Sequence, residues 1–227
     1  MLHDSPVYAG KMSAVVRNLG VMGYAEAHAL QLQCVQEQLE RDDIPEQVLV
    51  TEHPSVFTLG RAGSLNGLIK SRDEISSSGV DIVHTERGGD ITYHGPGQLV
   101  VYPIINLRKR NLSVSAYIHI LEEIMLLTAA DSGVTAARDE RNRGIWVGDN
   151  KIGSVGIRIR HGISFHGLAL NVNLSLEPFR WVRPCGLTGV GVSSLQEELE
   201  ENISIEKVRN NMHKHLVYYF CEEKVCR

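Results

Sequence analysis

The segment Arg87–Gln98 constrains the fold most, because four glycines and a proline fall within twelve residues. It reads Arg-Gly-Gly-Asp-Ile-Thr-Tyr-His-Gly-Pro-Gly-Gln, between strand-like runs at Val80–Thr85 and Leu99–Ile105. A hairpin turn needs only one or two glycines. Glycine lets the backbone approach a ligand closely, and free N–H groups in such loops attract carbonyl oxygens and anions. The segment therefore predicts a binding loop rather than an irregular turn, with rim donors from Arg87, Thr92, Tyr93 and His94.

Apolar spacing predicts helices and strands interspersed along the chain. Helices are expected over Tyr24–Arg41, from a cap at Ser113 or Ser115 to about Ala130, and after a cap at Ser204. Strands are expected at Gln47–Glu52, Val56–Leu59, Ile145–Val147, Lys151–Arg160 and Ile163–Val172. No repeat or linker divides the chain. This order favours one α+β domain over residues 1–227, with a core of about 19–220 and a mixed sheet flanked by helices.

Composition excludes several classes of function. The formal net charge is -4, so no basic footprint for nucleic acid or a membrane surface is present. No apolar run is long enough for a transmembrane helix, and the first twenty residues lack the apolar stretch of a secretory signal. The four cysteines have no metal or disulfide spacing. We expect a reduced, cytoplasmic protein without a metal.

Lys151 begins a strand-like run in which Val155, Ile157 and Ile159 alternate with polar residues and glycine. Because side chains in a strand alternate between faces, the lysine falls on the apolar face, where an unpartnered lysine is rare. A bulge at Gly153 or Gly156 would change this register. An exposed lysine at the start of the strand is an equally open interpretation.

Cys185 lies in the loop-like stretch Arg183–Gly189 and has no apolar stripe to join. Cys34, in contrast, lies on the apolar stripe of the first predicted helix, and the remaining two cysteines lie at a chain end. Cys185 is therefore the best candidate for thiol chemistry, although a lone loop cysteine is more often inert.

The glycine segment and three other blocks together resemble the signature blocks of lipoyl(octanoyl) transferases. The other blocks are Lys151-Ile-Gly-Ser-Val-Gly156, His166-Gly-Leu-Ala-Leu-Asn171 and Arg183-Pro-Cys-Gly186. Glu52-His-Pro followed by Thr58-Leu-Gly-Arg61 is similar to the family's first block. The blocks follow the family's order from about Leu19 to the last helix, and as a set they are highly specific.

The resemblance implies a single domain of the biotin/lipoate protein ligase type, which is class II synthetase-like. It implies transfer of an octanoyl or lipoyl group from acyl carrier protein to a lysine ε-amine, the first step of endogenous lipoate synthesis. The expected acceptors are lipoyl domains of 2-oxoacid dehydrogenase complexes and the glycine cleavage H protein. No cofactor is expected.

The resemblance also assigns the site residues. Cys185 is the expected nucleophile, and Lys151 is its expected partner and the base. Asp90 stands where glutamine is more usual in the family. This departure affects the expected lining at one edge of the pocket and leaves the expected chemistry unchanged. The acyl pocket is expected to be lined by Arg87, Gly88, Gly89, Asp90, Ile91, Thr92, Tyr93, His94, Ser154, Val155, Gly156, Gly167, Leu168 and Ala169.

The residue types suit this chemistry independently. A thioester passes its acyl group readily to a thiol, so Cys185 could form an acyl-enzyme. A free thiol has a pKa near ~8.5, and an ammonium within about 4 Å stabilises its thiolate by roughly 4 kcal/mol before desolvation is subtracted. Lys151 would supply that ammonium and later act as a base.

Other classes stay open on the sequence. An ATP-dependent lipoate or biotin ligase would share the fold but has no use for Cys185. A cysteine-dependent thioester hydrolase would use His94 or His166 as its base. A non-catalytic binding module ranks last, because it explains neither the lysine nor the loop cysteine.

Overall fold

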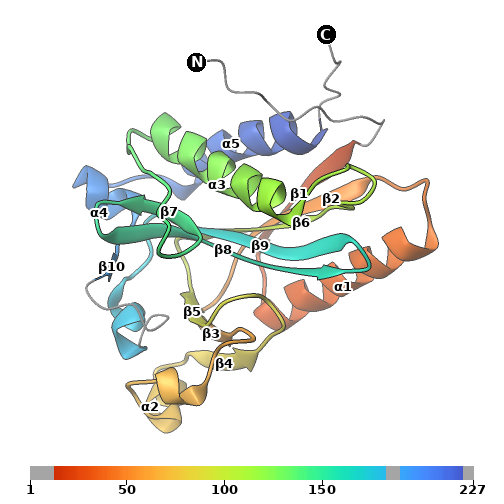
Figure 1. Ribbon diagram of the computed structural model, residues 1–227. Coiled ribbons are helices and arrows are strands. Elements are labelled where there is room, and N and C mark those ends of the chain that lie inside the picture. Colours follow the sequence, from red (N-terminus) through yellow and green to blue (C-terminus); the bar gives the residue numbers. More distant parts are fainter. Residues whose placement is uncertain (1–12, 183–189, 222–227) are drawn as a thin grey trace.

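The larger of two sheets forms the centre of the molecule, shown in a computed structural model that describes residues 13–182 and 190–221 (Figure 1). Its strands run β1-β2-β6-β9-β8-β10, and β7 pairs with β8. The pairs β1–β2 and β8–β10 are parallel and the others antiparallel, so the sheet is mixed as predicted. The strand bounds are β1 Ala14–Val21, β2 Glu46–Glu52, β6 Gln98–Ile104, β7 Gly144–Val147, β8 Asn150–Arg160, β9 Ile163–Asn171 and β10 Gly191–Val192.

Helices cover both faces of this sheet (Figure 1). Helices α3 (Val114–Asp131) and α5 (Ile205–Leu216) lie side by side on one face, and α1 (Tyr24–Glu40) lies on the other. The central strand β6 is buried on both faces, as its apolar run requires. Leu99 and Val101 join the core under α3 and α5, while the alternate residues Val100, Tyr102 and Ile104 join the core under α1.

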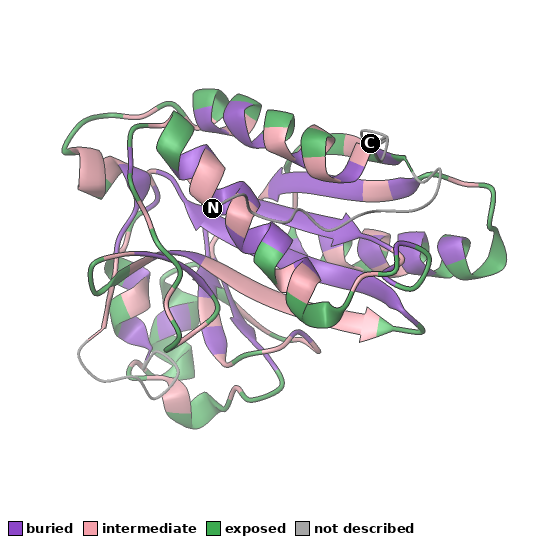
Figure 2. Cartoon of the chain, turned by 45° about the horizontal axis from the view of Figure 1, so that its top comes forward, coloured by how far each residue is buried: buried purple, intermediate pink, exposed green. Residues whose placement is uncertain are grey.

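Figure 2 shows that burial follows these layers, because strands in the middle of the sheet such as β6 and β9 are buried and the outer faces of the helices are exposed. Strands β1 and β8 are mostly half-buried or exposed. Ser113 and Ser204 begin α3 and α5, and each side chain accepts a hydrogen bond from a backbone N–H of the first turn. Both predicted caps are confirmed.

A smaller sheet of three strands, β4-β3-β5, carries the glycine segment. It comprises β3 Val56–Leu59, β4 Asp81–His84 and β5 Ile91–His94, and a separate apolar cluster around Phe57, Ile75 and Trp181 supports it. The short helices α2 (Arg72–Ser77) and α4 (Leu195–Leu199), and short helical turns at Leu65–Gly67, Glu177–Trp181 and Val217–Cys221, complete the chain.

Most predicted elements are confirmed within two residues of their expected ends. The predicted binding segment Arg87–Gln98 is not a loop throughout, because its β-prone middle, Ile91–His94, forms the edge strand β5 and pairs with β3. The glycines bend the backbone on either side of this strand, with positive φ at Gly89 (86°) and Gly97 (89°). In the described part of the chain, no helix is both long and apolar enough to cross a bilayer.

Candidate active site

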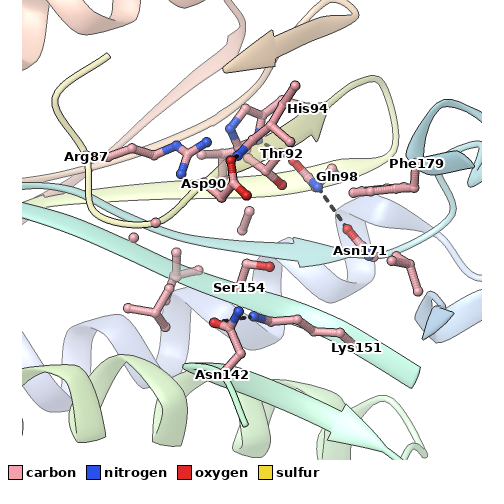
Figure 3. Close-up of a pocket in the computed structure, with 18 of the residues that line it drawn as sticks. Arg87, Asp90, Thr92, His94, Gln98, Asn142, Lys151, Ser154, Asn171 and Phe179 are labelled. Atoms are coloured by element: carbon pink, nitrogen blue, oxygen red, sulfur yellow. Dashed lines mark hydrogen bonds between the residues drawn. The ribbon is translucent and has the colours of Figure 1, made fainter. Parts of the chain in front are cut away.

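A cavity of about 130 Å³ lies between the two sheets. Its walls come from strands β8 and β9 of the large sheet and from the 87–94 segment of the small one (Figure 3). The structure brings together almost every described residue of the predicted site. Those that line the cavity are Arg87, Gly88, Gly89, Asp90, Ile91, Thr92, His94, Lys151, Ser154, Val155, Gly156, Gly167, Leu168 and Ala169.

Tyr93 is the exception among the predicted residues. Side chains alternate along β5, so Tyr93 points away from the cavity that its neighbours Thr92 and His94 line. Its hydroxyl lies 2.9 Å from Oγ of Ser55, and its ring packs against Phe57. Tyr93 therefore belongs to the core of the small sheet, and its assignment to the pocket is wrong.

Backbone hydrogen bonds hold the 87–90 bend on both sides. Gly88 N donates to Ile157 O of β8 at 3.0 Å, and Gly60 N donates to Asp90 O at 3.1 Å. A Cβ at Gly60 would lie 2.4 Å from Gly89 O, so only glycine permits this approach. Oδ1 of Asp90 accepts a hydrogen bond from the N–H of Ile91, so this carboxylate caps the edge of β5.

Arg87 is buried under the bend and does not lie on a rim as predicted. Its guanidinium donates to the carbonyl and hydroxyl oxygens of Thr58 in β3, at distances of 2.5–3.1 Å. It also donates to the carbonyl of Gly88. The charged group thus joins the glycine bend to the small sheet, and its place in the cavity wall follows from that anchoring.

His94 is also buried, within a chain of hydrogen bonds. Its Nδ1 lies 2.7 Å from Oε1 of Gln98, and the Gln98 amide donates to Asn171 at 2.8 Å (Figure 3). Nε2 of His94 lies 3.4 Å from the hydroxyl of Thr58. Burial lowers the pKa of His94 to about 3, so the ring is neutral at pH 7. His94 therefore fixes the cavity wall and is not a rim donor.

Lys151 projects into the cavity wall from β8. The register between β7 and β8 shifts there, because Ile145 pairs with Gly153 while Trp146 pairs with Lys151. This bulge places Ile152 in the core under α3 and breaks the alternation toward Val155. Lys151 thus does not share the apolar face of Val155, Ile157 and Ile159. The apolar-face interpretation is therefore wrong, and the alternative that a bulge changes the register is confirmed.

The half-buried ammonium of Lys151 has defined neighbours. Nζ donates a hydrogen bond to Oδ1 of Asn142 at 3.1 Å and lies 5.3 Å from the centre of the Trp146 ring (Figure 3). Gly144 has φ 134°, and a Cβ there would lie 2.8 Å from Cε of Lys151. The absence of a side chain at Gly144 therefore makes room for the aliphatic part of the Lys151 side chain.

Cys185 lies in the 183–189 stretch, outside the described residues. The described residues on either side of that stretch, Val182 and Val190, both line the cavity.

Several cavity residues were not predicted. Gln98, His166 and Asn171 stand in the quoted sequence blocks, but the blocks do not show which side chains face a cavity. Tyr24 and Asn142 carry no sequence signal, because one begins a helix and the other lies in a loop outside the blocks. The unpredicted polar and aromatic members are Tyr24, Gln98, Tyr102, Asn142, Trp146, His166, Asn171 and Phe179.

His166 has an unusual backbone. Its φ is 55° inside strand β9, a conformation that costs a non-glycine residue on the order of 1–3 kcal/mol. Its N–H donates to Oε1 of Gln31 in α1 at 2.8 Å. Burial, followed by the charge of His28, lowers the pKa of His166 to about 3.

Residues 23–217 match the family model of the lipoyl protein ligase A/B catalytic domain. The chain belongs to this family. Its relatives include an octanoyltransferase of Desulfotalea psychrophila, which is 47% identical over 197 residues. The match covers 86% of this chain and 88% of that protein. An octanoyltransferase of Bacteroides fragilis is 38% identical over 215 residues, covering 91% of this chain and 97% of the relative.

The fold is similar to that of solved lipoate-protein ligases. A lipoate-protein ligase A bound with ATP superposes with a TM-score of 0.75 at 16% identity, covering 95% of this chain and 90% of that chain. A bipartite archaeal lipoate-protein ligase from Thermoplasma acidophilum superposes with a TM-score of 0.70 at 16% identity. The match covers 95% of this chain and 88% of that chain. These structures confirm the predicted fold class.

Proposed function

We propose that this octanoyltransferase carries its acyl group on Cys185 and uses Lys151 to control the protons of the reaction. Octanoyl transfer in lipoate synthesis is the activity of its relatives, which are 36–47% identical over most of the chain. The observation that supports these roles for Cys185 and Lys151 is the position of Lys151. It lies in the wall of the cavity formed by the predicted acyl-binding residues, and Val182 and Val190, the described residues that flank the stretch containing Cys185, line the same cavity.

In the first half-reaction, the Cys185 thiolate attacks the carbonyl carbon of an octanoyl thioester. The bond from that carbon to the donor sulfur breaks, and the donor leaves as a thiolate that takes up a proton from the Lys151 ammonium, which leaves this amine neutral for the second half-reaction. The Lys151 ammonium stabilises the attacking thiolate by its charge. The product is a thioester on the enzyme, of nearly the same energy as the thioester consumed.

In the second half-reaction, a lysine amine of the acceptor attacks the acyl-enzyme. The new amide bond forms as the Cys185 thiolate leaves, and the attacking nitrogen gives up a proton. Lys151 in its neutral form can accept that proton, and the hydrogen bond to Asn142 fixes its position. One residue thus serves as cation first and base second.

The cavity wall includes apolar side chains that an acyl chain can contact. Ile91, Val100 and Leu168 supply apolar wall, and Gly156 and Gly167 also line the cavity. A Cβ at Gly167 would lie 2.2 Å from Val101 O, so the sheet itself also requires this glycine.

The hydrolase alternative finds little support in the two histidines. His94 has both ring nitrogens engaged, and the pKa of His94 and of His166 is lowered to about 3. A base of that pKa accepts a proton poorly at pH 7. The ligase alternative leaves Cys185 without a role.

We further propose octanoyl-acyl carrier protein as the donor. The acceptors would be lipoyl domains of 2-oxoacid dehydrogenase complexes and the glycine cleavage H protein. The expected setting is the cytoplasm, with residues 1–227 acting as a single catalytic domain.

A transfer assay without nucleotide tests this function. The enzyme, octanoyl-acyl carrier protein and an unmodified lipoyl domain are mixed, and the mass of the lipoyl domain is followed. We expect one octanoyl group per lipoyl domain at a rate that ATP does not change. A requirement for ATP with free octanoate, accompanied by ATP–pyrophosphate exchange, would identify a ligase instead. Release of free octanoate at the transfer rate would identify a hydrolase.

A further inference from the structure

A cluster of two histidines and a glutamate lies at the cavity wall, which His166 itself lines. His28 comes from α1, Glu86 directly precedes the buried Arg87, and His166 comes from β9. Oε2 of Glu86 lies 3.2 Å from Nε2 of His28 and 3.8 Å from Nε2 of His166. One ligand atom from each residue can be chosen so that all three lie within 4.8 Å of one another.

Polar atoms without hydrogen bonds gather at this cluster. Over residues 13–182 and 190–221, the buried side-chain nitrogens or oxygens that lack a hydrogen bond are Nε2 of His28, Nε2 of Gln31 and Nδ1 of His166. Gln31 lies one helical turn after His28, and its Oε1 holds the His166 backbone. Buried polar atoms are nearly always bonded, and exceptions commonly mark a water or an ion. Two of these exceptions belong to His28 and His166, and the third belongs to Gln31, which holds the backbone of His166.

We infer that His28, Glu86 and His166 form a binding site for a divalent transition-metal ion, with zinc as the best match. Two imidazole nitrogens and one carboxylate oxygen are a common donor set for zinc, which binds each at about 2.0–2.2 Å. In a tetrahedral site such ligands are about 3.3 Å apart, a value that the two measured distances to Glu86 bracket. A water molecule would complete the coordination.

Small side-chain rotations suffice to close the site. The rings of His28 and His166 are stacked, with planes 11° apart and centres 5.4 Å apart. Binding therefore turns at least one ring about its Cβ–Cγ bond, so that its nitrogen points to the ion. The side chains of His28 and Glu86 are 24% and 37% exposed, so an ion can enter from solvent, whereas His166 at 2% closes the inner side.

The site would connect three parts of the molecule. An ion held there ties α1 to β9 and to the residue that leads into the 87–90 bend of the cavity wall. The strained backbone of His166, which surrounding contacts must hold in place, sets its ring against the ring of His28. Metal binding is therefore expected to stiffen the cavity wall without contacting the reacting atoms proposed above.

Cobalt binding tests the site directly. The purified chain is treated with a chelator, dialysed, and titrated with Co²⁺, whose visible absorption reports four-coordinate binding. We expect one equivalent per chain and no thiolate-to-cobalt charge-transfer band, which separates this site from cysteine binding. Zn²⁺ should displace the cobalt and raise the Tm by about 5–10 °C at a hundredfold excess over its Kd.

Variants locate the ion. His28→Ala and Glu86→Gln should each weaken cobalt binding at least tenfold while retaining a cooperative melt, because both side chains are partly exposed. His84→Ala, an exposed histidine in β4, should bind as wild type does. Absence of stoichiometric binding, or cobalt affinity unchanged in both His28→Ala and Glu86→Gln, would overturn the proposal. The cluster would then be an ordinary ion pair with bound water. Octanoyl transfer assays report the proposed function separately.

Discussion

Nζ of Lys151 donates a 3.1 Å hydrogen bond to Oδ1 of Asn142, which links strand β8 to the loop before β7. The two residues are nine apart in sequence and lie on opposite sides of the β7–β8 turn. An amide oxygen orients the ammonium without adding a charge. The neutral partner leaves Lys151 able to lose a proton when the acceptor amine attacks.

Asn142→Ala should slow transfer about tenfold, because one hydrogen bond to a charged group is worth about 1.5–3 kcal/mol and is only partly replaced by water. Asn142→Asp should move the midpoint of the pH–rate profile upward, since a carboxylate favours the ammonium. The measurement is the rate of acyl transfer to a lipoyl domain between pH 6 and pH 10. Asn150→Ala, exposed and adjacent to Lys151, is the matched control. Identical profiles for Asn142→Asp and wild type would contradict a positioning role.

Arg87→Ala should destabilise the fold by about 2–4 kcal/mol, because it removes several hydrogen bonds from a buried charged group and leaves the Thr58 carbonyl without them. The sequence alone predicts the opposite, a variant that melts like wild type but loses activity. Urea unfolding of Arg87→Ala and of the exposed Arg61→Ala decides between the two. Equal urea midpoints for the two variants would instead support the sequence-based prediction that Arg87 lies on the rim of the cavity.

Stability should fall on acidification through His94. The pKa of His94 is lowered to about 3 from its usual 6.5, chiefly by burial. The unfolded chain therefore binds the proton first, and the stabilisation present above pH 6.5 is lost as pH falls toward 3. Each pH unit in this window removes up to about 1.4 kcal/mol.

Between pH 7 and pH 5, wild type should consequently lose about 2 kcal/mol more unfolding free energy than His94→Gln. Denaturant unfolding at both pH values measures this difference. His84→Gln, at an exposed position of β4, is the control and should behave like wild type. Parallel losses in His94→Gln and wild type would show that His94 is protonated in the fold.

Periodicity was sufficient to predict the main helices and strands, because apolar alternation reports directly on burial. β6 has apolar residues on both faces, and the capping serines of α3 and α5 mark the helix starts. The faces of individual side chains were harder to predict. The bulge opposite Trp146 reverses the alternation after Lys151, and the nearby Gly153 indicates that a bulge is possible there without deciding that it forms.

The site residues illustrate the same limit. Glycine-rich blocks indicated which segments form the cavity, but β5 turns Tyr93 away and buries His94. Asn142 and His28 were missed because their partners are spatial neighbours from other elements. The roles of Cys185 and Lys151 stay predictions.

The pairing of Lys151 with Cys185 should appear in thiol reactivity. An adjacent ammonium lowers a cysteine pKa, so alkylation of Cys185 should titrate below the free-thiol value of about 8.5. In Lys151→Ala the midpoint should rise by about one unit or more, and Lys151→Arg should restore part of the shift without restoring full transfer. Cys34, Cys221 and Cys226 are first replaced so that one thiol reports. An unchanged alkylation midpoint in Lys151→Ala would show that a positive group other than Lys151 stabilises the Cys185 thiolate.

Intact mass spectrometry after incubation with octanoyl-acyl carrier protein tests the central claim most directly. We predict that the wild-type chain gains the mass of one octanoyl group, that hydroxylamine removes it, and that a lipoyl domain accepts it. Cys185→Ser should show no hydroxylamine-labile label, and Lys151→Ala should gain the label slowly. A thioester label that persists in Cys185→Ser, or transfer at the wild-type rate by that variant, would contradict the account.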